Sequence, residues 1–94
     1  MNAPKRTQIE WGGLTIVVYD FQVGDTLDWH EHPESSTHLS VITRGPLEML
    51  TEGQDIVILE DGDVSLPGDG PTRHRFNART APARLINIHR VDKR

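Results

Sequence analysis

The chain has 94 residues and a mass of 10.6 kDa, which is the size of a single domain. Ten basic and fourteen acidic residues give a net charge of −4, which argues against nucleic acid and anionic membrane surfaces as partners. The apolar runs are too short to cross a bilayer, and the first ten residues lack the apolar core of a signal peptide. The absence of cysteine excludes disulfides, cysteine-ligated zinc and a cysteine nucleophile. We therefore expect a cytoplasmic protein.

Turn residues divide the chain into short segments of the kind that form β-strands. Glycine and proline recur about every eight to twelve residues, and the runs between them are rich in β-branched and apolar side chains. In chain order, the expected strands are Leu14–Phe21, His38–Thr43, Leu47–Thr51, Asp55–Leu59, Val64–Leu66, Arg73–Asn77 and Arg84–Val91. A Gly12-Gly13 hairpin turn joins the first of these strands to the preceding Ile9–Trp11 run.

This spacing predicts an all-β domain, a sandwich or barrel of short strands. No window of about twelve residues has the apolar periodicity of a helix. No change of composition marks a linker, so residues 1–94 are expected to form one domain, with residues 1–7 and 92–94 as mobile polar tails.

Four of the five histidines follow a pattern that points to a metal site. His30 and His32 are separated by one residue in an extended segment, so their side chains share a face. After Pro33, His38 begins the next strand, which we expect to pair back antiparallel and bring His38 level with the first two. His74 lies on a later strand that must be adjacent in space to complete a site. A β-scaffold presents imidazole ligands to a metal in this way.

Two motifs around these histidines resemble those of the cupin superfamily. The first consists of Gly, five residues, His-x-His, three or four residues, Glu, six residues and Gly. The positions that match it are Gly24, His30, His32 and Gly45, with His38 where the family has glutamate. The second consists of Gly-Asp, Pro, Gly, His and Asn, and the positions that match it are Gly62, Asp63, Pro67, Gly70, His74 and Asn77. Together the motifs span more than half of the chain.

The resemblance implies a small jelly-roll barrel, or double-stranded β-helix, with a divalent transition metal inside one mouth. Some small cupins have a similar four-histidine site. The implied ligands are His30, His32, His38 and His74. Iron, manganese, nickel, copper and zinc all occur in the superfamily, and the sequence does not choose between them.

The histidine at position 38 changes the charge of such a site. Four neutral imidazoles leave the full charge of a divalent ion uncompensated, which sharpens its Lewis acidity and weakens retention of Mg²⁺ or Ca²⁺. An octahedral ion with four protein ligands keeps two positions open for water, dioxygen or a bidentate substrate. Glu34 is an alternative fourth ligand if its loop bends inward, although ten residues separate it from Gly45. Glu31 alternates away from the histidine pair.

Neighbouring residues have plainer interpretations. Strand alternation turns Arg73 and Arg75 away from the His74 face, towards solvent or a salt bridge. His89 belongs to neither motif and is interpreted as a surface histidine.

Asp28 shares the parity of His30, so its carboxylate is either a partner for an imidazole N–H or an ordinary carboxylate near a turn. Trp29 points the opposite way. The expected inward positions near the site are Ser40, Ile42 and Phe76. They predict a small, mostly apolar pocket.

Two classes of function fit these features. The resemblance implies a metal-dependent oxidoreductase of the dioxygenase type that acts on a small organic molecule. The alternative is a non-catalytic metal- or small-ligand-binding module, because Glu34 and Asp28 are the only candidate acid–base groups beside the metal. An isomerase at the same site is a third possibility, and no catalytic residue is assigned. Because the core is thin, we expect a homodimer that buries outward apolar residues such as Leu39 and Val41.

Overall fold

Every element of secondary structure in the described part of the chain is a strand or a turn. The structure is a computed structural model that describes residues 2–31, 36–65 and 73–91, and the side chains of residues 31, 36–38 and 91 lie outside it. The strands are β1 (Lys5–Trp11), β2 (Leu14–Phe21), β3 (Thr26–Glu31), β4 (Ser36–Arg44), β5 (Leu47–Thr51), β6 (Val57–Leu59), β7 (Val64–Ser65), β8 (Arg73–Asn77) and β9 (Ala83–Val91). The all-β prediction is confirmed. Among the described segments there is no helix long and apolar enough to span a membrane.

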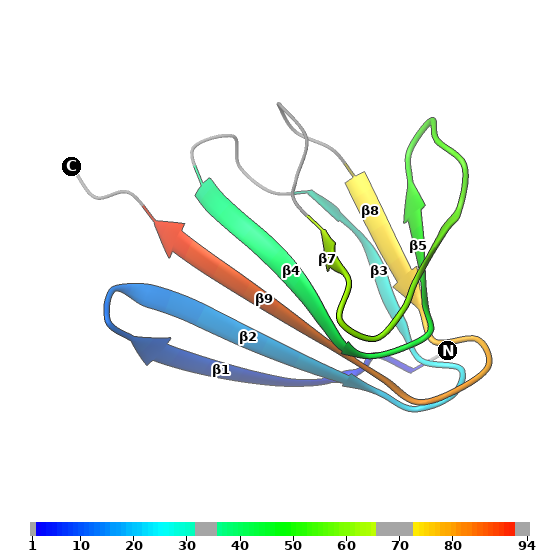
Figure 1. Cartoon of the computed structure of the whole chain (residues 1–94), viewed down its shortest axis with the longest axis horizontal. Helices are drawn as coiled ribbons and strands as arrows, with labels where there is room; N and C mark the ends of the chain where they lie inside the picture. Colours follow the sequence, from blue (N-terminus) through cyan, green and yellow to red (C-terminus); the bar gives the residue numbers. More distant parts are fainter. Residues whose placement is uncertain (1, 32–35, 66–72, 92–94) are drawn as a thin grey trace.

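The strands form two antiparallel sheets that face each other (Figure 1). The five-stranded sheet has the order β1-β2-β9-β4-β7, and the four-stranded sheet has the order β3-β8-β5-β6. Most neighbours within a sheet come from distant parts of the sequence, which is the connectivity of a jelly roll. The last strand, β9, lies between β2 and β4 and joins the two halves of the larger sheet.

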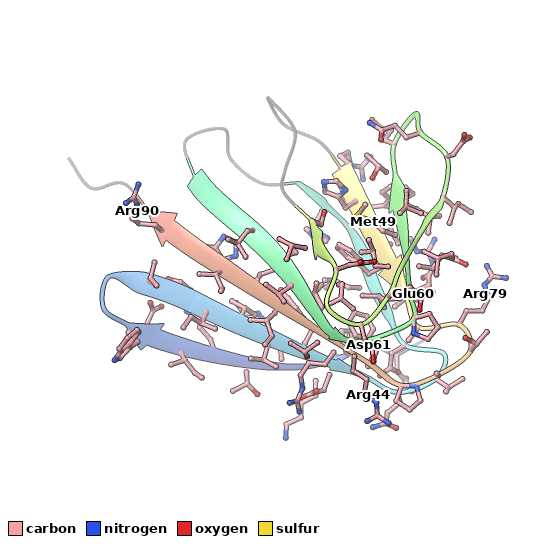
Figure 2. All side chains as sticks on the ribbon, viewed as in Figure 1. Arg44, Met49, Glu60, Asp61, Arg79 and Arg90 are labelled. Atoms are coloured by element: carbon pink, nitrogen blue, oxygen red, sulfur yellow. The ribbon has the colours of Figure 1, made fainter. Side chains whose placement is uncertain are left out.

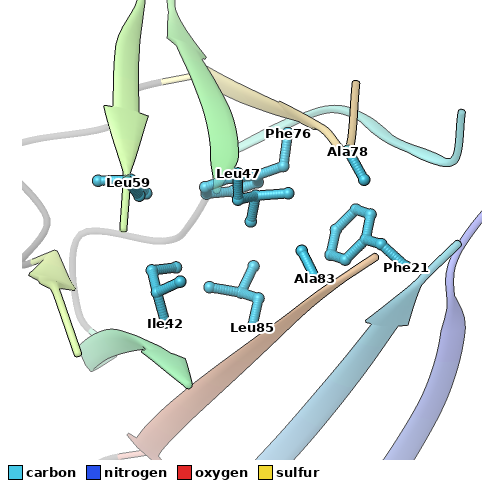
Figure 3. Packing of buried hydrophobic residues seen from close by; sticks show 8 residues of the cluster. All are labelled: Phe21, Ile42, Leu47, Leu59, Phe76, Ala78, Ala83 and Leu85. Atoms are coloured by element: carbon cyan, nitrogen blue, oxygen red, sulfur yellow. The ribbon is translucent and has the colours of Figure 1, made fainter. Parts of the chain in front are cut away.

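The core fills the space between the two sheets, with side chains from both (Figure 3). Its buried members are Phe21, Ile42, Leu47, Leu59, Phe76, Ala78, Ala83 and Leu85. Period-two alternation explains which residues enter it, since Ala83 and Leu85 of β9 are buried while Arg84 between them is exposed. The predicted inward positions are confirmed, because Ser40, Ile42 and Phe76 are 5%, 0% and 4% exposed.

Glycine is required at three positions of the two motifs, for two different structural reasons. Gly24 and Gly62 adopt φ angles of +93° and +84°, in the left-handed region that other residues avoid. Gly45 is needed for space, because a Cβ at this position would lie 2.7 Å from the carbonyl oxygen of Leu59. These glycines set the turns and the close approach that bring the motif strands together.

Some element boundaries differ from the sequence prediction. The predicted mobile tail to Thr7 is wrong from Lys5 onward, because β1 begins there and Thr7 pairs with Val18 of β2. Its polar composition was misleading, since main-chain pairing along a sheet edge does not require apolar side chains. The predicted strand Asp55–Leu59 is shorter in the structure, and Leu66 and residues 92–94 lie outside the described part.

Candidate metal centre

His30 and His74 lie directly opposite each other on neighbouring strands. The register of β3 and β8 pairs His30 with His74, and their ring centroids are 6.5 Å apart with an interplanar angle of 53°. Both rings also contact the buried ring of Phe76, at centroid distances of 6.1 Å and 6.3 Å. The fold therefore brings together one predicted ligand from each motif, with an aromatic side chain next to both.

A backbone hydrogen bond fixes the tautomer of His30. Its Nδ1 lies 2.8 Å from the carbonyl oxygen of Asp28. Because a carbonyl only accepts, Nδ1 carries the hydrogen and the lone pair is on Nε2, the atom that can coordinate a metal. Metal-binding histidines are commonly oriented by such a bond from the other ring nitrogen.

His74 is held by Thr51 of β5, whose hydroxyl can either donate to Nδ1 or accept from it. The Thr51 Oγ1 is 3.0 Å from His74 Nδ1, and Thr51 is directly opposite His74 in the register and is 8% exposed. Burial, and then the charge of His30, lower the pKa of His74. The neutral imidazole, which is the metal-binding form, is thus favoured. The described donor atoms fit a transition metal bound through two Nε2 atoms.

The remaining predicted ligands are only partly described. His32, Glu34, Pro67 and Gly70 lie outside the described residues, and of His38 only the backbone is described. No group of three metal-binding side chains occurs among the residues whose side chains are described. The four-histidine set therefore stays a prediction, of which this part of the chain contains His30 and His74.

The expected pairing of the His38 strand with the His30 strand is wrong. The strand of His38, β4, belongs to the five-stranded sheet between β9 and β7, whereas β3 belongs to the opposite sheet. Side-chain alternation does not reveal which sheet a strand joins, and the jelly-roll connectivity separates these two neighbours. In Figure 1 the end of β3 and the starts of β4 and β8 are nonetheless at the same, upper end of the barrel. The backbone of His38 is therefore in the sheet opposite that of His30.

A β-bulge corrects the expected position of Asp28. The register passes from Leu27 opposite Phe76 to His30 opposite His74, so β3 has an extra residue between these pairs. The Asp28 carboxylate is consequently on the outer face, 3.9 Å from Arg75 and with 82% of the side chain exposed. Asp28 does support His30, but through its carbonyl oxygen rather than its carboxylate.

His89 is not the plain surface residue that the sequence suggested. Its Cα partner on β4 is His38, and it has the same parity on β9 as the buried residues Leu85 and Asn87. His89 is half-buried, and burial together with the positive charge of Arg6 lowers its pKa. Its parity with Leu85 and Asn87 was the signal in the sequence that would have placed it on the inner face.

Comparisons with known proteins agree on this architecture. No protein-family model and no curated protein matches the sequence. Among solved structures, KdgF from Halomonas sp. is 21% identical, with 94% of this chain and 80% of that chain covered at a TM-score of 0.74. A Klebsiella pneumoniae protein with a double-stranded β-helix domain is 16% identical, with 94% and 76% covered and a TM-score of 0.77.

A third similar structure is a sugar phosphate isomerase of the cupin superfamily from Silicibacter pomeroyi. It is 18% identical, with 93% of this chain and 60% of that chain covered at a TM-score of 0.74. The chain has the cupin fold. The jelly-roll prediction is therefore confirmed, and within the cupin barrel the histidine-bearing ends of β3 and β8 lie in one mouth.

The arginines beside His74 face away from the cupin barrel interior, as predicted. Arg73 forms an ion pair with Glu52 at 3.2 Å, and its guanidinium lies 5.7 Å from the ring centroid of Trp29. These contacts hold the guanidinium of Arg73 on the outer face, and Arg75 pairs there with Asp28.

Two surface hollows of about 420 and 290 Å³ lie away from the histidines. Both are bordered by Glu48, Asn77 and Arg79, and no histidine lines either of them. Glu48 is held there by Arg79 at 3.1 Å and by Asn77 at 3.2 Å. Figure 2 shows Arg79 projecting outward from the four-stranded sheet. The hollows are therefore separate from His30 and His74.

Replacing Thr51 with valine tests the support of His74. Valine keeps the shape of the side chain but removes the oxygen that lies 3.0 Å from His74 Nδ1. We expect affinity for a divalent transition metal to fall about 10- to 100-fold. The measurement is competition with a chromophoric chelator, and Thr51→Ser, which keeps the hydroxyl, is the control. Equal affinities of the valine and serine variants would contradict the assigned role.

The stability of the metal-free cupin barrel is expected to fall as the pH decreases from 8 to 5. The pKa values of His74 and His89 are lowered in the folded protein, so the unfolded chain binds more protons around its own histidine pKa of about 6.5. This stabilisation is complete above that pH and is lost as the pH falls through the folded pKa. Urea unfolding with a chelator present measures it. His89→Gln should flatten the profile, and an unchanged slope in that variant would count against the assignment.

Proposed function

We propose that this protein is a small metal-dependent oxidoreductase of the dioxygenase type that acts on a small organic molecule. The metal ligands in this proposal are His30, His32, His38 and His74. The observation that supports it is the facing pair of His30 and His74, each oriented through Nδ1 by a neighbouring oxygen. Two surface histidines that did not bind a common ligand would not need an oxygen atom to orient each ring.

The metal supplies a Lewis acid and, for iron, manganese, nickel or copper, a redox centre. The residues of this chain orient the histidine ligands and exclude water from one side of the site. Phe76 lies beside both imidazoles and is 4% exposed, which keeps water from that side of the site. On the opposite sheet, Ser40 donates a hydrogen bond to Asn87 at 2.5 Å, so these buried polar groups satisfy each other.

The chemistry of the described surroundings favours a small substrate of low charge. The two cations next to His74 on its strand, Arg73 and Arg75, are directed outward and paired with Glu52 and Asp28. The inner face beneath the histidines is formed by the apolar side chains of Phe76, Leu27 and Met49. A site with this lining would bind through apolar contact and through the open positions of a metal rather than through ion pairing.

Oxygen consumption with separately reconstituted metals tests the proposal. The chelator-treated protein is loaded with iron, manganese, nickel, copper or zinc and is offered panels of diketones, flavonols and thiols. We expect uptake of dioxygen with one substrate class and with a redox-active metal, and loss of uptake in His74→Gln. Failure of every metal and substrate class to support uptake would contradict the oxidoreductase proposal.

An isomerase at the same site is the second candidate. It is supported by the similarity to the sugar phosphate isomerase, although this chain covers only 60% of that protein. Conversion of sugar phosphates, followed by proton NMR with each reconstituted metal and with His74→Gln, distinguishes it from the oxidoreductase. Metal binding without turnover in either assay would favour a non-catalytic binding module.

A further inference from the structure

The outer face of the four-stranded sheet carries a row of residues with one member from each strand. Phe76 and Met49 pack in or against the core, so the residues that alternate with them on β8 and β5 point outward. The strand registers align the outward row as Thr26, Asn77, Glu48 and Ile58. The two surface hollows lie over this row, because its members are among the residues that line them.

The polar members of the row are joined by hydrogen bonds into one network, here called the outer network. Thr26 donates its hydroxyl hydrogen to Asn77 Oδ1 at 2.9 Å, and Asn77 Nδ2 donates to Glu48 Oε1 at 3.2 Å. Arg79 completes the network, with its Nε 3.1 Å from Glu48 Oε2 and its Nη2 3.3 Å from Glu48 Oε1. A two-point contact of this kind holds a guanidinium and a carboxylate in a fixed relative geometry.

The outer network retains hydrogen-bonding capacity of both signs. A guanidinium has five N–H donors, and within the described part of the chain Glu48 engages at most two of those of Arg79. A carboxylate has about four acceptor positions, and Asn77 and Arg79 together occupy at most three of those of Glu48. The Arg79 side chain is 70% exposed, so its remaining donors are accessible to a ligand. A bound molecule can therefore meet a cation and an anion at adjacent positions.

The charges that line the larger hollow are balanced, and part of its wall is apolar. The charged residues are two acids and two bases, Asp25, Glu48, Arg75 and Arg79. A ligand with a single charge meets two residues of its own sign here, whereas a zwitterion finds an opposite charge for each of its own. Leu50 and Ile56 supply apolar wall, and Ile56 is 55% exposed. A few fixed polar groups beside apolar side chains are typical of small-molecule sites.

We propose that the larger hollow binds an α-amino acid with an apolar side chain. The carboxylate of the ligand pairs with Arg79, its ammonium pairs with Glu48, and its side chain packs against Leu50 and Ile56. The hollow has a volume of about 420 Å³, within the range of about 300–1,000 Å³ for small-molecule sites. No histidine lines it, so this second site is independent of the metal-dependent activity proposed above.

Titration of L-leucine and L-phenylalanine into isotope-labelled protein, followed by amide chemical shifts, tests the proposal. We expect saturable shifts at millimolar concentration in residues of the hollow such as Leu50 and Ala78. Three analogues of leucine each remove one feature: 4-methylpentanoate lacks the ammonium, isopentylamine lacks the carboxylate, and L-serine lacks the apolar side chain. Each should bind at least about tenfold more weakly than leucine, because each leaves one part of the site without its contact.

Arg79→Gln should weaken the binding of leucine at least about tenfold, because it removes the cation that pairs with the carboxylate. Arg79 is exposed, so the barrel should remain folded, and circular dichroism verifies this. Arg84→Gln is the matched control. Arg84 is also an exposed arginine paired with a carboxylate, that of Asp20 at 2.6 Å, but it lines neither hollow. This control should bind leucine as the wild type does.

The proposal is supported if leucine shifts the amides of the hollow, all three analogues bind more weakly, and only Arg79→Gln loses affinity. It is overturned if neither amino acid produces saturable shifts there, or if any of the three analogues binds as tightly as leucine. Equal affinities of Arg79→Gln and Arg84→Gln for leucine would also overturn it. None of these measurements depends on turnover.

Discussion

The His74→Gln variant is expected to bind divalent transition metals at least about 100-fold more weakly than the wild type. Loss of an orienting partner alone typically costs 10- to 100-fold, so loss of a ligand should cost more. Glutamine fills most of the imidazole volume beside Phe76, where the two rings are 6.3 Å apart, so the barrel should remain folded. Competition with a chromophoric chelator measures the affinity, and circular dichroism verifies the fold.

His89→Gln is the matched control for that experiment. His89 is also a half-buried histidine of the inner face with a lowered pKa, but it belongs to neither cupin-like motif. Its substitution should change the metal affinity less than about tenfold, as expected of a residue outside the ligand set. If the two variants bind metal equally well or equally poorly, the assignment of His74 rather than His89 as a ligand is wrong.

Leu85→Ala is expected to lower the free energy of unfolding by about 3 kcal/mol, within the range of about 2–5 kcal/mol for buried leucines. Leu85 is fully buried and lies on β9 opposite Ile42 of β4, which is also 0% exposed. A domain of this size has a total stability of only about 5–14 kcal/mol, so the loss is a large fraction of it.

Urea unfolding of the chelator-treated Leu85→Ala protein at a fixed chain concentration measures this loss. Val57→Ala is the control, because Val57 is 45% exposed and should cost less than about 1 kcal/mol. If Leu85→Ala lost no more stability than Val57→Ala, the core between the two sheets would not be packed as described.

The sequence allowed the fold class to be predicted because turns and alternation are local properties. The ranges Leu47–Thr51 and Arg73–Asn77 are strands as predicted, and residues of the expected parity are buried. The cupin-like motifs correctly related His30 to His74, although more than forty residues separate them in the sequence. A resemblance to family motifs can indicate that residues far apart in the sequence are close in the fold. The alternation of side chains along one strand cannot indicate this.

The features that could not be predicted depend on contacts between distant strands. Alternation does not indicate which sheet a strand joins, so β4 was expected beside β3. It also fails at a bulge, so the Asp28 carboxylate was expected on the His30 face. His89 was assigned to the surface because its neighbour His38 is brought beside it only by the pairing of β4 with β9.

The central claim, one metal held by His30, His32, His38 and His74, is tested most directly by anomalous diffraction. Crystals of the protein loaded with a single transition metal would be measured above and below its absorption edge. We predict one strong peak at about 2.1 Å from the Nε2 atoms of His30 and His74, with imidazoles of the other two histidines completing the shell. A carboxylate of Glu34 in the place of His38 would correct the fourth ligand. A peak remote from His30 and His74, or none at full loading, would contradict the account.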